Sequence, residues 1–428
     1  MPLFTPELEF SDDYPTIEPS LKLDFANARA LDPRITFTRA STATYVGRDG
    51  LIKTAGEDEA RFDHDPTTGE SLGLLIEESR TNYQDYSVDI NTGRDFLTGS
   101  TLTANAAAAP DGTTTATRIT GSGVDEATRL GWNTQATSNT QYNVFSVFVK
   151  ADSGTPILGF YSNTFVAGNV AFNIDLSDGT TNTINNPGSF YSKVVAYPNG
   201  WYRVTVMGGV GTGASGSWNI NLVPSLTSAR LASSGSNASA SYLIWGVQEE
   251  LATSSFPTSY IPTSGSTATR SKDDALITGG SFESWINKNE GTWLIDFRLL
   301  GAGAGLLSIS NTGASVNERY MMWNIATDGQ VSAAVVDGGV LQTNESISFT
   351  PGQTTQFTKA IFAVKDNDFA ITANGLTPVT DTSGTVYNSP TQLRFAYGNG
   401  NSTPYAHFKT CIYYPKRLPN AQLQTLTQ

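Results

Sequence analysis

The segment from Tyr242 to Leu251 narrows the possible folds, because it predicts a strand packed on at least one face. Side chains alternate between the two faces of an extended backbone. Pro257 and Pro262 then prevent regular ladder bonding, and the sequence at 264–269 offers nothing from which to build a core. We therefore expect this strand to end one domain. One face should carry Tyr242, Ile244, Gly246 and Gln248, and the other Leu243, Trp245, Val247 and Glu249.

Short β-rich runs of this kind recur along most of the chain. They are separated by clusters of Gly, Asn and Asp, and with 40 glycines and only 15% charged residues the composition is typical of all-β proteins with many tight turns. The strongest run is 142–150, with Val144, Ser146 and Phe148 predicted to face one way and Phe145, Val147 and Val149 the other. Residues 83–262 hold enough such runs for an eight-stranded jelly roll.

A second set of runs lies between residues 291 and 414. We expect a linker at 263–280, a second β-sandwich at 281–428, and a short C-terminal helix over 419–426. Residues 1–82 contain short strand patterns, including a hairpin at 44–54, but no evident closed core. They are expected to form an extended N-terminal β arm that packs on another domain or subunit.

Charge and composition exclude several classes of protein. The net charge is −13 and Lys and Arg form no run, so nucleic acid is not an expected partner. No apolar run approaches the ~20 residues of a membrane-spanning helix, and the N-terminus lacks the pattern of a signal peptide. Cys411 is the only cysteine, which excludes an intrachain disulfide and favours a buried structural thiol. We expect folding in a reducing cytoplasm.

Several segments resemble known sequences. The segments at 23–25, 36–45, 61–65 and 73–82 resemble the amino-terminal part of phage virion proteins of the tail-fibre or head-fibre kind. The segments at 108–114, 199–204 and 242–262 are similar to their carbohydrate-binding-module-like jelly roll. The end of the chain, 412–424, resembles the closing strand and helix of a concanavalin A-like (laminin-G-like) domain.

The resemblance implies a virion structural protein, a fibre or spike, made in the host cytoplasm. It implies a homotrimer joined to other virion proteins through the N-terminal arm, with host-surface glycans as the hypothetical ligand. It transfers no defined ligand-binding residue. The alternatives are a purely architectural component, such as a capsid decoration or a baseplate or tail adaptor, and a polysaccharide depolymerase.

Catalytic patterns are weak. The Gly-x-Gly-x-x-Gly spacing at 211–216 precedes a strand-like run rather than a helix, which favours a hairpin loop over a dinucleotide site. His407 lies four residues before Cys411, so the two side chains are predicted to share a strand face, yet no pattern of a cysteine hydrolase surrounds them. The adjacent pairs Glu77–Glu78 and Glu249–Glu250 should point to opposite faces, whereas glycoside hydrolysis needs two carboxylates across a cleft. We expect no enzyme.

Cofactor and metal sites are not expected. The acidic clusters at 63–65 and 366–368 offer oxygen ligands, and calcium in the second is a weaker alternative to turn chemistry. Sugar binding would use exposed aromatic side chains with polar neighbours. Most of the seven tryptophans should be buried. The candidates for glycan contact are Trp132, Trp218, Tyr320 and Trp323.

Overall fold

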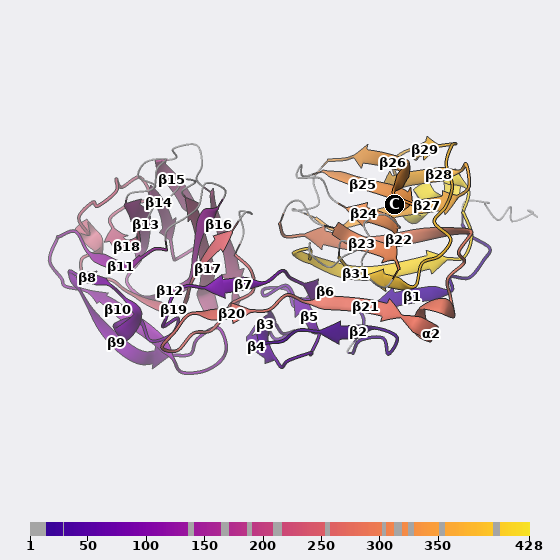
Figure 1. Ribbon diagram of the computed structural model, residues 1–428. Coiled ribbons are helices and arrows are strands. Elements are labelled where there is room, and N and C mark those ends of the chain that lie inside the picture. The colour runs from indigo at the N-terminus through magenta and orange to yellow at the C-terminus, as the bar shows by residue number, and fades with distance from the viewer. Residues whose placement is uncertain are drawn as a thin grey trace, which may run out of the picture. The chain divides into compact units, whose positions relative to one another are not determined.

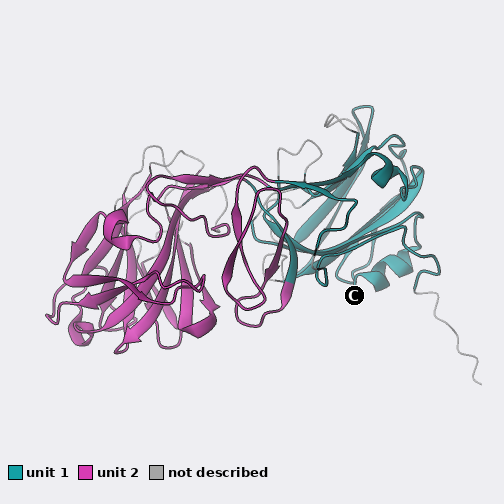
Figure 2. Ribbon diagram, turned by 90° about the horizontal axis from the view of Figure 1, so that it is seen from below, with its two compact units in different colours: residues 1–38, 72–78, 273–428 teal, residues 39–71, 79–272 magenta. Residues whose placement is uncertain are grey.

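The computed structural model confirms an all-β chain with a short C-terminal helix. It describes residues 14–28, 30–135, 141–163, 171–185, 191–208, 216–252, 257–301, 305–311, 319–323, 329–350, 356–396 and 403–428. The chain forms two compact units, shown in Figure 2. Unit 1 comprises residues 1–38, 72–78 and 273–428, and unit 2 comprises residues 39–71 and 79–272.

Unit 2 is a sandwich of two six-stranded antiparallel sheets (Figure 1). The first sheet has the order β16 (Tyr191–Tyr197), β17 (Trp201–Gly208), β12 (Tyr142–Ser153), β19 (Ser241–Ala252), β10 (Ala116–Gly121) and β9 (Ser100–Ala107). The second has the order β15 (Thr181–Asn185), β14 (Ala171–Asp175), β13 (Ile157–Asn163), β18 (Ser217–Val223), β11 (Arg129–Asn133) and β8 (Phe96–Thr98).

Smaller elements complete unit 2. The predicted hairpin is present as β3 (Ala43–Val46) and β4 (Ile52–Ala55). β5 (Arg61–His64) follows it, and β7 (Arg80–Asn82) pairs with β20 (Ala268–Arg270). The helical turns are α1 (Ile90–Gly93), η1 (Pro198–Gly200) and η2 (Gly235–Asn237).

The two faces of β12 are divided as the alternation predicts. Phe145, Val147 and Val149 lie in the core between the sheets, whereas Phe148 packs outside it against Trp245. Each face thus buries its own apolar cluster, and burial of such side chains is the main stabilising term of the sandwich.

The prediction for β19 holds only as far as Trp245. Gly246 has φ = +65° and forms a bulge, because Phe148 pairs with Trp245 while Ser146 pairs with Gln248. A bulge inserts one extra residue and reverses the alternation beyond it. Val247 consequently joins Tyr242 and Ile244 in the core, and the assignment of 246–249 to faces was wrong.

Unit 1 is built from two further sheets. One has the order β2 (Thr36–Thr38), β21 (Asp274–Thr278), β30 (Gln392–Arg394), β23 (Gly305–Ser310), β24 (Arg319–Trp323), β25 (Gln330–Asp337) and β26 (Val340–Ser348). The other contains β29 (Val379–Asp381), β28 (Phe369–Ala373), β27 (Thr358–Lys365), β22 (Glu290–Leu299) and β31 (Ala406–Tyr414), with β1 (Leu21–Asp24) and β6 (Ser71–Ile76) both paired to β31.

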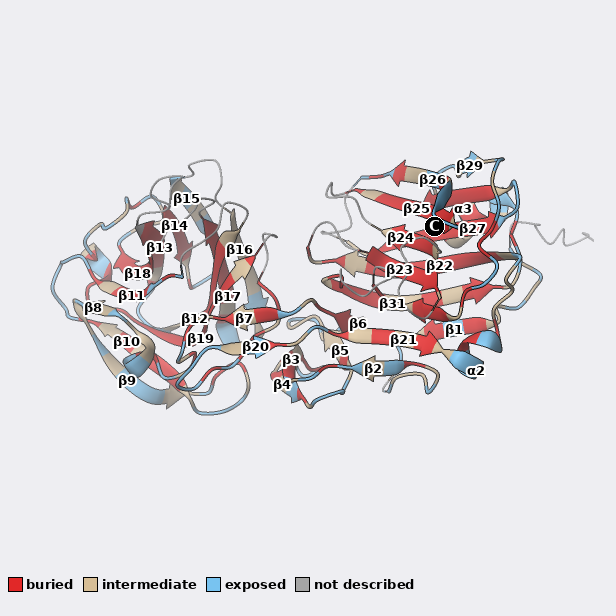
Figure 3. Ribbon diagram, in the orientation of Figure 1, coloured by how far each residue is buried: buried red, intermediate tan, exposed pale blue. Residues whose placement is uncertain are grey.

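Short helices close unit 1. α2 (Gly279–Glu283) follows β21, and the predicted terminal helix is α3 (Asn420–Leu426), which buries Leu423 against Ile361 and Ala370 of one sheet face. On the other side of that sheet, Phe408 contacts Phe395 with ring centroids 5.1 Å apart. Figure 3 shows how much of these strands is buried.

The expected N-terminal arm differs from the observed division. β1 and β2 complete the sheets of unit 1, with Leu21 opposite Tyr413 and Thr36 opposite Leu276, while the β3–β4 hairpin belongs to unit 2. β1 and β2 therefore pack on another domain of the same chain, which is one of the two expected alternatives. The expected linker at 263–280 likewise contains β20 and β21. Residues 1–13 of the arm lie outside the described part.

Candidate functional site

The two tryptophans proposed for glycan contact in unit 2 are core residues. Trp132 and Trp218 lie opposite each other on β11 and β18 and are 0% and 1% exposed. Both contact Phe145 of the other sheet, with ring centroids 5.5 and 6.0 Å away. The structure corrects this proposal, because side chains enclosed between two sheets cannot stack on a sugar.

The two residues of unit 1 proposed for glycan contact differ in their solvent exposure. Tyr320 is 4% exposed and its hydroxyl donates a hydrogen bond to the carbonyl of Tyr387, so it is also a core residue and not a glycan contact. Trp323 ends β24 and is half-buried. Of the four proposed aromatic residues, only Trp323 presents part of its ring to solvent.

Glu249 is a structural carboxylate inside unit 2. It is fully buried and accepts hydrogen bonds from Gln84 Nε2 at 2.5 Å, the Gln135 amide at 2.7 Å and Asn143 Nδ2 at 2.5 Å. The Oδ1 atom of Asn143 in turn accepts from Trp218 Nε1 at 2.7 Å. Burial raises the pKa of Glu249, although the three donors favour its charged form.

Glu250 is bound separately from its neighbour. It accepts from the Thr258 amide at 2.9 Å and from Gln248 Nε2 at 3.0 Å, as well as from the Thr258 hydroxyl. Burial raises its pKa, and the charges of Arg80 and Arg203 oppose that rise. The two glutamates thus bind different segments, and neither is open to a substrate.

The Cys411 thiol of unit 1 is not a nucleophile in this arrangement. It is buried, and burial raises the pKa of the thiol to about 12. Lys409 is the extra residue of a bulge in β31, because Phe408 pairs with Phe297 and Thr410 with Asp296. The bulge reverses the alternation, so His407 and Cys411 do not share a face as predicted.

The acidic clusters serve turns and pairings. Asp65 Oδ1 accepts from the amides of Thr67 and Thr68, both at 2.9 Å, and Asp368 pairs with Arg417 at 2.9 Å. Among the described residues, no group of three or more His, Cys, Asp or Glu side chains is placed to hold a metal ion. The 211–216 motif lies almost wholly outside the described residues.

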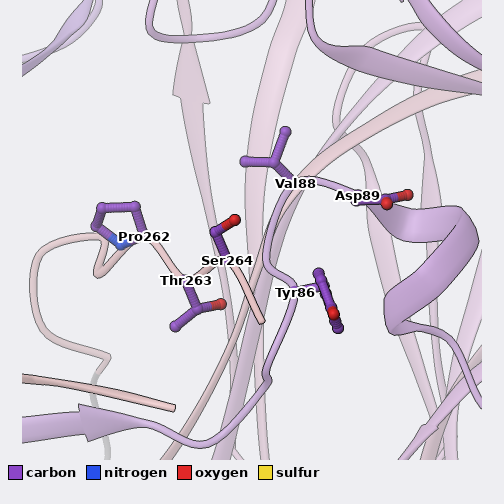
Figure 4. Close-up of a pocket in the computed structure, with 6 residues that line it drawn as sticks. All are labelled: Tyr86, Val88, Asp89, Pro262, Thr263 and Ser264. Atoms are coloured by element: carbon purple, nitrogen blue, oxygen red, sulfur yellow. The ribbon is translucent and has the colours of Figure 1, made fainter. Parts of the chain in front are cut away.

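A cavity of about 390 Å³ lies in unit 2, where the segment after β19 runs beside the segment after β7 (Figure 4). Its volume falls within the range of about 300–1,000 Å³ typical of small-molecule sites. Tyr86 forms a β-bridge with Ser264 across it. It is lined by Tyr86, Val88, Asp89, Pro262, Thr263 and Ser264.

Hydrogen bonds hold the two walls of this cavity together. The Thr263 amide donates to Ser87 Oγ at 2.8 Å, and the Thr263 hydroxyl donates to the Gln84 carbonyl at 2.6 Å. Ser87 Oγ also bonds the Tyr260 hydroxyl at 2.7 Å, while the Gly265 amide donates to the Asp85 carbonyl at 2.8 Å. The cavity is therefore pre-formed rather than dependent on a ligand to order it.

The lining offers a mixed chemistry. Tyr86 is a half-buried aromatic ring, whereas Asp89, Pro262 and Ser264 are exposed. Asp89 caps α1 by accepting from the Thr92 amide at 3.2 Å and hydroxyl at 2.7 Å. An ionised carboxylate has about four lone-pair directions, so acceptor capacity remains for a ligand hydroxyl. The arrangement suits a neutral polyhydroxylated ligand that stacks one face on Tyr86.

Sequence reasoning missed this cavity. Its walls come from segments far apart in the chain, and Tyr86 lies outside any alternating run. The usable signal was the Asp89-Ile-Asn-Thr92 capping pattern, which fixes the direction of the Asp89 carboxylate.

No protein-family profile and no curated protein sequence matches the chain. Solved structures give distant similarities. The Ruminococcus gnavus IT-sialidase CBM40 bound to α2,3-sialyllactose is 16% identical over 33% of this chain and 83% of its own, with a TM-score of 0.28. Mouse laminin α1 domains LG4-5 are 12% identical over 68% and 85%, with a TM-score of 0.23.

Trypanosoma rangeli sialidase in complex with the inhibitor DANA is 8% identical over 73% of this chain and 60% of its own, with a TM-score of 0.27. Similarity at this level assigns neither a ligand nor an activity. No helix in the described ranges has the length and apolar character needed to cross a bilayer.

Proposed function

We propose that this chain is a structural protein of a phage virion, a fibre or spike, that contacts host-surface glycans through the cavity at Tyr86. The sequence resemblance supports the virion role, and the cavity supports the ligand class. The observation that carries the glycan contact is the pre-formed site in which an aromatic ring, a carboxylate and a hydroxyl meet. The ligand is a neutral sugar unit of a surface polysaccharide.

The test uses the full chain on a glycan array that includes polysaccharides of candidate bacterial hosts. Tyr86→Ala removes the stacking surface, and Trp323→Ala is the matched control, because that ring is half-buried in the other unit. We expect retained signals with Trp323→Ala and lost signals with Tyr86→Ala. Equal binding by the two variants would remove the cavity from the proposal.

A purely architectural role is the second candidate, favoured by a specific surface of unit 1. Val340 and Leu341 are 60% and 56% exposed at the start of β26, which is the edge strand of its sheet. Exposed apolar side chains on an edge strand are typical of protein contacts. Under this role, replacing both residues with serine should abolish incorporation into virions, and the unmodified chain should bind no host glycan.

The trimer is part of the proposal and rests on the resemblance. Light scattering of the purified chain should give three times the monomer mass of 45.7 kDa. A folded monomer would count against the fibre assignment.

We propose no catalytic step. Glu249 and Glu250 are enclosed by hydrogen-bond donors, whereas a depolymerase presents two carboxylates about 5–10 Å apart in a cleft. Release of new reducing ends from host polysaccharide by the purified chain would favour the depolymerase instead.

A further inference from the structure

The outer face of the second sheet of unit 2 carries a row of side chains that the core does not use. Trp218, Ile220 and Leu222 of β18 point into the core, so Asn219 lies on the opposite face. Tyr161 of β13 is its direct neighbour across the strands, and Gly131 of β11 is its neighbour on the other side.

Tyr161 has an unusual environment on this face. The residue is 1% exposed, yet its hydroxyl has no hydrogen-bond partner among the described residues. A buried hydroxyl without a partner costs free energy, and the loss is recovered when a ligand accepts its hydrogen bond. The unpaired hydroxyl therefore points to a missing acceptor.

Two cations converge on the same place. The guanidinium carbon of Arg230 lies 5.3 Å from the centre of the Tyr161 ring. Arg129 donates from Nε to Asn219 Oδ1 at 2.7 Å, and its guanidinium stacks on Phe96 at 3.7 Å. Arg129 also donates from Nη2 to Ser217 Oγ at 3.5 Å. Burial raises the pKa of the Tyr161 hydroxyl, and the charges of Arg129 and Arg230 oppose that rise.

We propose that Tyr161, Arg129 and Arg230 form a site for a small oxyanion, the carboxylate or sulfate group of an acidic ligand. The two guanidinium groups supply the positive charge, and the Tyr161 hydroxyl donates to the anion. Local cations are required here because the chain as a whole carries a net charge of −13 and repels anions. Arg230 is half-buried on the segment between β18 and η2, and its side chain moves aside to admit the anion.

This site is separate from the cavity at Tyr86 and does not depend on it. The cavity at Tyr86 binds a neutral sugar through an aromatic ring and hydroxyl partners, whereas the site at Tyr161 binds a ligand through its negative charge. A Tyr86→Ala variant is expected to bind the anion as the unmodified chain does, so the two proposals fail independently.

Isothermal titration of the full chain with sodium glucuronate, sodium sulfate and glucose tests the proposal. The key variant is Tyr161→Phe, which keeps the ring and removes only the hydroxyl; because that hydroxyl is unpaired, we expect unfolding at the same or a higher temperature. Arg129→Gln removes one cation. Arg118→Gln is the control, since Arg118 is a half-buried arginine of the same unit that pairs with Asp152 at 2.7 Å.

We expect saturable binding of an anion but not of glucose. Tyr161→Phe loses one hydrogen bond to a charged group, so its Kd for the anion should be about tenfold higher. Arg129→Gln should weaken binding further, and Arg118→Gln should leave it unchanged. Preference for glucuronate assigns a carboxylate ligand, and preference for sulfate assigns a sulfated or free anion. The absence of saturable anion binding, or an equal Kd in Tyr161→Phe, would overturn the site.

Discussion

The interiors of the two units differ in how they treat polar groups. In unit 2, the Glu249 carboxylate is buried at one end of the sandwich and is linked through Asn143 to the indole of Trp218. In unit 1, Trp293 and Tyr413 contact each other with centroids 4.2 Å apart, and the Tyr413 hydroxyl donates only to main-chain carbonyls. Burial raises the pKa of a carboxylate in each unit, Glu249 in unit 2 and Asp296 in unit 1. The contrast lies in the hydrogen bonds: the stability of unit 2 should depend on the donors that hold Glu249, and that of unit 1 mainly on aromatic packing.

The largest effect is expected from Trp293→Ala in unit 1. Trp293 is 1% exposed and contacts Trp285 and Tyr413, with centroids at 5.6 and 4.2 Å. Truncation of a buried tryptophan to alanine costs about 3–5 kcal/mol. Chemical denaturation should show the loss of unfolding free energy, and hydrogen exchange should localise this loss to residues 273–428. A loss below about 1 kcal/mol would mean that packing does not dominate in this unit.

A smaller loss is expected from Glu249→Ala in unit 2. The change leaves the buried donors of Gln84 and Asn143, and the part-buried amide of Gln135, without an acceptor. Each unsatisfied buried group costs about 1–3 kcal/mol, and water molecules that enter the space satisfy some of these donors. We therefore expect the unfolding free energy to fall by about 2–4 kcal/mol. Glu249→Gln is the matched control, because it keeps an acceptor oxygen and should cost less. Equal losses in both variants would show that charge rather than hydrogen bonding matters.

Gly246→Ala tests the bulge that brings Val247 and Glu249 inward. A side chain at φ = +65° costs about 1–2 kcal/mol, and the new Cβ would lie 3.0 Å from the Phe148 ring. The unfolding temperature of the variant should fall accordingly. Gly338→Ala is a control at positive φ, since its Cβ meets nothing within 4 Å. A smaller loss at Gly246 than at Gly338 would contradict the role of the close contact.

The pH dependence is the subtlest expectation. Burial raises the pKa of both Glu249 and Glu250 above the ordinary value of 4.5, so the folded state favours their protonated forms. Their contribution to stability is therefore complete below pH 4.5 and is lost as the pH rises through the raised values. Relative to the unmodified chain, Glu249→Gln should lose less stability as the pH rises. Parallel curves of stability against pH for the two proteins would show that the pKa of Glu249 is the same in the folded and unfolded states.

These differences were only partly visible in the sequence. Alternation sufficed for β12, where both faces are regular, and the Asp49-Gly50 turn sufficed for the β3–β4 hairpin. It failed at Gly246, because a bulge depends on a backbone angle that residue type permits but does not require. It also gave no partner for β1, whose pairing with β31 joins the two ends of the chain.

The candidate site was less predictable than the fold. Trp132 and Trp218 were proposed because sugars stack on aromatic rings, yet large rings in central strands are mostly buried. Tyr86 lies in an irregular segment, and its cavity exists only because Thr263 is bonded to Ser87 and Gln84. Such contacts between distant segments follow from the tertiary fold rather than from any local pattern.

Isothermal titration of the full chain and of Tyr86→Ala with neutral oligosaccharides from a host surface polysaccharide measures whether the Tyr86 ring contributes to glycan binding. Loss of a stacking ring corresponds to a change of about 1 kcal/mol or more, so we expect saturable binding that weakens at least about fivefold in the variant. An unchanged Kd in Tyr86→Ala, with Trp323→Ala abolishing binding instead, would contradict the account.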